Sequence, residues 1–269
     1  MVKKLFKYEI SFYAKRLLPF YIILFVVAAF SRFLEIFENN TVVYNIIYGS
    51  SIFAYVVAGI SSIVSVLVLA VSRYYKNLYT AEGYLSFTLP VTPTQHIFVK
   101  TATALLFDLF SIVAFALSFL IISIGDLGVE VFRAIAYLAD KYFDKLGVHG
   151  VFYIPEVLLL LLVASIFSLF IFYSCVTIGQ LAKKNRVAAS VGVYFGFYLI
   201  EQIIGTVMII VVAIVSEYDW WDRFVSKILR GIKVYLHIGF IGYTLILAAV
   251  AVALFFINRH IMTKKLNLE

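Results

Sequence analysis

The stretch from Val157 to Ile178, VLLLLLVASIFSLFIFYSCVTI, contains no charged residue and decides the fold class. A helix rises about 1.5 Å per residue, so roughly 20 apolar residues cross the hydrocarbon core of a bilayer. A barrel strand needs only about 9–11 residues and alternates apolar with polar side chains, which this run does not do. The stretch therefore predicts a membrane-spanning α-helix.

Similar stretches recur along the chain, and the predicted spans are residues 17–37, 48–73, 99–124, 152–182, 186–216 and 235–258. The 269 residues are 64% hydrophobic and 14% charged, with a mean hydropathy of +1.02. A soluble domain is about 45–50% apolar and about 25% charged. We therefore predict an all-α membrane protein, a single transmembrane domain over residues 1–269. This composition excludes a water-soluble enzyme and a nucleic-acid partner bound on an ordinary soluble core.

The distribution of charge predicts the orientation of the six transmembrane helices. With the N-terminus inside, the inner segments hold 14 of the 22 Lys and Arg residues and 3 of the 15 acidic residues. The net charge is then +11 inside and −2 outside, which has the sign of the positive-inside rule. We expect an N-in/C-in, multi-pass protein of the cell membrane.

Three segments outside the spans are amphipathic. Residues 3–16 combine lysines with apolar residues at helical spacing, which predicts an N-terminal amphipathic interfacial helix on membrane lipid. The alternative is the charged flank of the first span. Residues 125–151 and 218–235, the latter with Trp220 and Trp221, predict short extracellular helices at the outer interface. A structural lid and a substrate-facing gate both remain open for them.

The inner loop over residues 74–98 is rich in aromatic residues and holds two of the four prolines. Residues 77–82 predict a helical turn that Gly83 ends as a C-cap. The prolines predict an extended passage, after which Thr92 or Thr94 is expected to cap the third span. An apolar loop on the water side must be covered by lipid headgroups or by another protein.

The candidate intramembrane polar residues are Asp108 in the third predicted span and Glu201 and Gln202 in the fifth. A carboxylate within the bilayer is costly and should face a cavity or a partner. Each is expected to be either a packing link between helices or part of a polar route or conformational switch. The spacing of the residues does not decide between these roles.

The fifth span carries small residues at intervals of four, Ala188, Gly192 and Gly196. Such a series allows two helices to approach closely. Packing within the bundle and packing between two subunits are both compatible with it.

Sequence signatures of catalysis are absent. The chain has no phosphate-binding loop, no zinc-protease motif, no nucleophile elbow and one cysteine, Cys175, and its four histidines are far apart in the sequence. We therefore predict no catalytic, cofactor-binding or metal residues, and a protein that is not an enzyme by itself.

The ordered features resemble a known family. The most specific segment is Glu82 to Pro93, EGYLSFTLPVTP, followed by Gly179 to Arg186, GQLAKKNR, after the fourth span and a tail ending KKLNLE. Together with six spans, this order resembles the permease subunit of a type-2 ABC exporter, in the group common in Gram-positive bacteria.

The resemblance implies function, partners and a site. It implies export of an amphipathic substrate, such as a peptide, an antibiotic or a lipid-like molecule, by alternating access. The partners would be an ATP-binding cassette subunit, which carries ATP and Mg²⁺, and a second permease copy or paralogue. No cofactor is expected in this chain. The implied ATPase-coupling residues are Tyr79, Glu82, Gly83, Tyr84, Leu85, Leu89 and Pro90.

Two other classes of protein remain compatible with the sequence. One is a membrane scaffold or sensor subunit that transports nothing and uses the same inner loop to hold a soluble partner. The other is a proton-coupled secondary transporter that uses Asp108 and Glu201.

Overall fold

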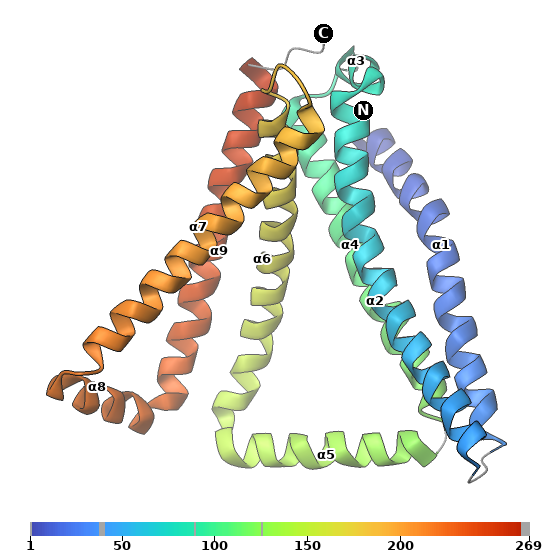
Figure 1. The fold of residues 1–269 in the computed structure, drawn as a ribbon, viewed down its shortest axis with the longest axis vertical. Coiled ribbons are helices and arrows are strands. Elements are labelled where there is room, and N and C mark those ends of the chain that lie inside the picture. Colours follow the sequence, from blue (N-terminus) through green and yellow to red (C-terminus); the bar gives the residue numbers. More distant parts are fainter. Residues whose placement is uncertain (1, 38–40, 89, 125, 265–269) are drawn as a thin grey trace. The chain divides into compact units, whose positions relative to one another are not determined.

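The computed structural model describes residues 2–37, 41–88, 90–124 and 126–264, which are almost entirely helical (Figure 1). Within these ranges there are nine helices and no strand. They are α1 (Val2–Glu35), α2 (Val42–Tyr79), α3 (Ala81–Thr88), α4 (Pro93–Ile122), α5 (Asp126–Leu146), α6 (Val148–Gly179), α7 (Arg186–Val215), α8 (Asp219–Arg230) and α9 (Ile232–Lys264).

Six of these helices, α1, α2, α4, α6, α7 and α9, are long and apolar enough to cross a membrane. They coincide with the six predicted spans, although most extend several residues beyond the predicted ends. The prediction of an all-α protein with six candidate spans is therefore confirmed. The N-in/C-in orientation stays a prediction.

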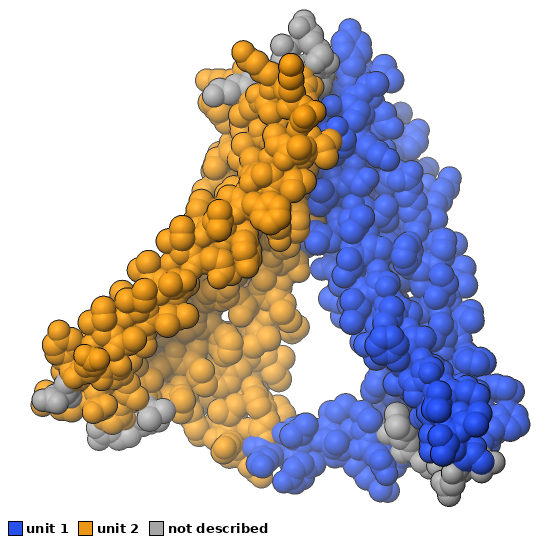
Figure 2. Space-filling view, viewed as in Figure 1, with its two compact units in different colours: residues 1–141 blue, residues 142–269 orange. Residues whose placement is uncertain are grey.

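The helices group into two compact units, residues 1–141 and 142–269, coloured separately in Figure 2. In the first unit, α1 packs on α2 and α4, α2 also packs on α4, and the short α3 packs on α2. In the second unit, α6 packs on both α7 and α9, and α8 contacts α9. Each unit thus has its own set of three long helices.

Helix α1 runs without a break from Val2 to Glu35, through Pro19. Its 34 residues give a length of about 50 Å, whereas a bilayer core is about 30 Å thick. The basic residues 3–16 are thus the first turns of the spanning helix. The prediction of a separate interfacial helix is wrong, and the charged flank of the first span describes this segment better.

The predicted helical turn ending at Gly83 is also wrong. Helix α2 continues to Tyr79, Thr80 is extended, and α3 begins at Ala81, so Gly83 lies within a helix. A Cβ atom at Gly83 would lie 2.5 Å from the carbonyl oxygen of Leu78. Glycine is needed here because the backbone of α3 approaches the end of α2 closely, and not because a helix ends.

Helix α4 begins as the sequence predicts, with Thr92 rather than Thr94 as the N-cap. The Thr92 hydroxyl accepts from the Gln95 backbone N–H at 3.3 Å, and the Gln95 side chain accepts from the Thr92 N–H at 3.0 Å. This capping box, together with Pro93 in the first turn, fixes the start of the helix.

The two predicted amphipathic segments between spans are helices, α5 and α8. In α8, Trp220 and Trp221 contact each other edge to face, with ring centroids 6.0 Å apart. Their placement at the outer membrane surface stays a prediction.

The glycine contacts generate a test by alanine substitution. Gly83→Ala should lower the free energy of unfolding by about 1–3 kcal/mol, because a backbone carbonyl blocks the added methyl group. Gly192→Ala on α7 is the matched control, because nothing lies within 4 Å of its Cβ position. The control should be neutral or stabilising by up to about 1 kcal/mol. Thermal unfolding of both purified variants measures the difference, and equal midpoints would contradict the close approach.

Candidate functional site

The most unusual contact of the first unit is a buried ion pair between α1 and α4. The Lys100 Nζ donates to Glu9 Oε1 at 2.7 Å, and the two residues are 2% and 1% exposed. Removing charges from water is costly, and a buried charge is tolerated only when it is paired and hydrogen-bonded. The pair therefore holds α1 and α4 in one relative position.

Arg73 near the end of α2 extends this ion pair to α3. Its Nε donates to Glu9 Oε2 at 3.4 Å, and its Nη1 donates to Glu82 Oε2 at 3.2 Å. We call Glu9, Arg73, Glu82 and Lys100 the charge network. It contains two acids and two bases from four different helices, so its formal charges balance.

Aromatic side chains surround the charge network. The guanidinium of Arg73 lies 4.2 Å from the ring centroid of Phe12, a cation–π distance. The adjacent Tyr13, which is fully buried, stacks on Phe107 of α4 with centroids 5.3 Å apart. These rings restrict Arg73 and exclude water from the Glu9–Lys100 pair, which strengthens the electrostatic attraction.

Helix α3 presents the exposed end of this arrangement. Tyr84 and Leu85 are 69% and 68% exposed, and the Glu82 side chain is 57% exposed although it bonds Arg73. Pro90 is exposed as well. Helix α3 is held on the bundle by the Arg73–Glu82 ion pair and exposes two large apolar side chains. It therefore forms a defined apolar protrusion.

Other predicted coupling residues are placed differently. Tyr79 is 6% exposed and its hydroxyl lies 3.5 Å from that of Tyr74, so the expectation that it meets a partner surface is corrected: the chain itself buries it. Gly83 is buried against α2. Leu89 lies outside the described residues.

Sequence reasoning singled out Glu82 but missed Glu9, Arg73 and Lys100, which it counted only as inner charges. One feature of the sequence did indicate a buried charge at Glu9. Glu9 is four residues before Tyr13 and eight before Leu17, so an acid shares a helical face with buried apolar residues. A lone charge on an apolar stripe indicates a paired charge, but the sequence does not identify its partners 64 and 91 residues away.

Asp108 shares one helical face of α4 with Ser111 and Ser118, and this face is only partly buried. Ser111 bonds the Tyr21 hydroxyl of α1 at 2.9 Å, and Ser118 bonds the Tyr55 hydroxyl of α2 at 3.1 Å. Both serines are buried and link helices, whereas Asp108 is half-buried. The serines therefore have the packing role, and the role of Asp108 stays a prediction.

Glu201 and Gln202 are both exposed on α7. Glu201 lies in the other unit from Asp108, and it lines a groove of about 190 Å³ between α6 and α7. The polar route that would use both carboxylates stays a prediction.

The small-residue series of α7 makes no close contact with the part of the chain that the structure describes. A Cβ atom at Gly192 or Gly196 would meet nothing within 4 Å, and Ala188 is exposed. No described residue of α7 is fully buried. Packing of this series within its own bundle, one of the two expected roles, is therefore not observed, and an interface between subunits stays a prediction.

A second polar cluster fastens the starts of α6 and α9. His149 Nδ1 lies 3.0 Å from His237 Nε2, and His237 Nδ1 lies 2.6 Å from Glu156 Oε1. Tyr153 stacks on His237, with centroids 4.3 Å apart, and donates to the Lys233 carbonyl. Two of the four histidines are thus in contact, although they are far apart in the sequence.

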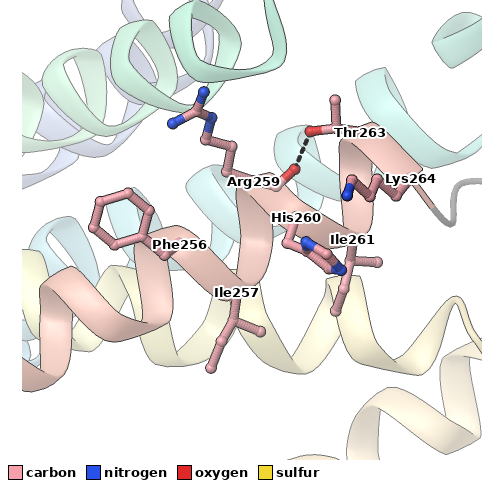
Figure 3. A pocket seen from close by; sticks show the side chains of 7 residues that line it. All are labelled: Phe256, Ile257, Arg259, His260, Ile261, Thr263 and Lys264. Atoms are coloured by element: carbon pink, nitrogen blue, oxygen red, sulfur yellow. Dashed lines mark hydrogen bonds between the residues drawn. The ribbon is translucent and has the colours of Figure 1, made fainter.

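A pocket of about 550 Å³ lies along the last turns of α9 (Figure 3). Its lining combines Phe256 and Ile257 with the basic residues Arg259, His260 and Lys264. All seven lining residues come from one helix, so they provide no opposing wall that would fix a ligand. Within the described ranges, no group of three or more metal-ligating side chains was found.

Comparisons of the chain with models of known protein families, with curated proteins and with solved structures found no match.

The charge network generates a test of stability. Lys100→Met leaves the buried Glu9 with Arg73 as its one remaining ion-pair partner, at the longer distance of 3.4 Å. The substitution should therefore lower the free energy of unfolding by about 3 kcal/mol. Lys76→Met is the matched control, because Lys76 is an exposed lysine near the C-terminal end of α2. Adding Glu9→Gln to Lys100→Met should restore part of the loss. If thermal unfolding of the Lys100 and Lys76 variants is the same, the buried pair does not stabilise the unit.

Proposed function

We propose that the chain is the transmembrane permease subunit of a type-2 ABC exporter in a bacterial cell membrane. The observation that carries the proposal is the exposed apolar end of α3, Tyr84 and Leu85, on a helix fixed to the bundle through Glu82 and Arg73. An exposed apolar protrusion of this kind is typical of a docking surface.

The proposal assigns energy conversion to a separate subunit. The sequence has no phosphate-binding loop, so ATP and Mg²⁺ belong on an ATP-binding cassette partner and this chain is not an enzyme by itself. Docking of α3 on that partner would move the charge network. A displacement of α3 would reach α2 through the Glu82–Arg73 pair, and then α1 and α4 through Glu9 and its partner Lys100.

A second permease copy or paralogue completes the proposed transporter. The open series of Ala188, Gly192 and Gly196 on α7 supports such a contact, because small residues allow close packing in lipid. The cargo of the exporter is proposed to be amphipathic.

The proposal predicts which side chains hold the ATPase. Tyr84→Ala should reduce co-purification of a co-expressed ATP-binding subunit at least about tenfold, because aromatic anchors dominate such interfaces. Glu82→Arg should have the same effect, since it places a second cation next to Arg73. Tyr137→Ala is the matched control, because Tyr137 is a similarly exposed tyrosine on α5.

Co-expression, affinity purification and substrate-stimulated ATP hydrolysis measure both binding and coupling. Full retention of the ATPase and of stimulated hydrolysis in the Tyr84 and Glu82 variants would reject the docking surface. Binding of an ATP-binding subunit without any transport would favour the scaffold or sensor. Transport driven by a proton gradient without that subunit would favour a secondary transporter.

A further inference from the structure

The groove between α6 and α7 combines aromatic rings with one carboxylate. Phe172 of α6 and Tyr194 of α7 stack with ring centroids 5.5 Å apart, and Phe197, Tyr198 and Glu201 continue the lining along α7. The groove has a volume of about 190 Å³. All of these residues belong to the second unit.

The groove and the small-residue series lie on opposite faces of α7. Residues three and four positions apart share a helical face, so Tyr194, Tyr198 and Glu201 point the same way, toward α6. Gly192 and Gly196 are offset from Tyr194 by two residues, which is about 200° around the helix. A second subunit packed on the glycines would therefore leave the groove uncovered.

No cation among the residues that the structure describes pairs with Glu201. Within the described residues it forms no ion pair or hydrogen bond, although it lies near the middle of a candidate span. It is about 20 Å along the helix axis from either end of α7, so a lipid headgroup amine at the membrane surface does not reach it. An intramembrane carboxylate requires a compensating group.

The side chains that line the groove indicate which kind of cation it would bind. Aromatic faces attract positive charge and contact apolar groups at the same time. A small metal ion would need several oxygen ligands, but Glu201 is the single carboxylate among the residues found to line the groove. An anion would be repelled by that carboxylate. An organic cation whose charge is shielded by apolar substituents satisfies both the carboxylate and the rings.

We propose that the groove between α6 and α7 binds a lipophilic organic cation, with its positive centre beside Glu201 and its apolar groups on Phe172, Tyr194 and Tyr198. The proposal concerns binding by this chain alone. It does not rest on the proposed ATP-binding partner, so it can fail or succeed independently of the proposed function.

Tetraphenylphosphonium is the probe, and tetraphenylborate is its counterpart of nearly the same size and shape with opposite charge. Equilibrium dialysis of the full chain in nonionic detergent, without any partner, should show saturable binding of tetraphenylphosphonium. Tetraphenylborate should not compete for the site. Empty micelles correct for partitioning into detergent.

Variants assign the binding to the groove. Glu201→Gln should weaken binding at least about tenfold, whereas Glu217→Gln, an exposed carboxylate beyond the end of α7, should leave it unchanged. Tyr194→Leu keeps the charge and removes a ring, and it should weaken binding severalfold. It also provides the test if the Glu201 variant does not elute as a single species.

Three results would overturn the proposal. The first is uptake that does not saturate or does not exceed that of empty micelles. The second is competition by tetraphenylborate equal to that by unlabelled tetraphenylphosphonium. The third is unchanged affinity in Glu201→Gln, or in Tyr194→Leu where the Glu201 variant does not fold.

Discussion

The ion pair between Glu9 and Lys100 is the constraint on which the first unit depends. Two full charges removed from water must stay within hydrogen-bonding distance, because separating them would leave Lys100 without its partner and Glu9 with Arg73 alone in an apolar surrounding. This requirement fixes the start of α1 against the start of α4. Arg73 transmits the same requirement to α3, because it bonds both Glu9 and Glu82. Apolar packing alone would tolerate sliding of α3, whereas a directional network of four charges specifies its position.

The second unit uses polar contacts differently. One cluster, with His149, His237 and Glu156, joins the starts of α6 and α9, and an Asn258–Ser174 hydrogen bond of 3.1 Å joins the same helices near their ends. Helix α7 packs on α6 without a fully buried residue. Two faces of one helix are therefore available, one bearing the glycines and one bearing the aromatic groove. In this unit, polar contacts at both ends hold α6 and α9 together, whereas the side chains of α7 are more exposed.

Much of the fold could be predicted because lipid imposes a simple rule: a span must be apolar over about 20 residues. The six long helices follow from that rule, and the Thr92 cap follows from local hydrogen-bond chemistry. The role of Gly83 could not be predicted, because it depends on the close approach of α3 to the Leu78 carbonyl. The charge network was missed for a similar reason. Composition gives the sign of each charge, but the pairing of Glu9 with Lys100 is a tertiary contact across 91 residues.

Hydrogen exchange of the α3 amides measures whether the charge network holds α3 in place. Glu9→Gln removes the acid shared by Lys100 and Arg73, whereas Glu35→Gln removes an acid from the same helix that pairs locally with Arg32. The amides of residues 84–88 should exchange at least about tenfold faster in the Glu9 variant, because opening of α3 becomes easier. They should exchange at the original rate in the Glu35 variant, and α8 should be unaffected in both. Unchanged protection of α3 in Glu9→Gln would show that the charge network does not hold α3 in place.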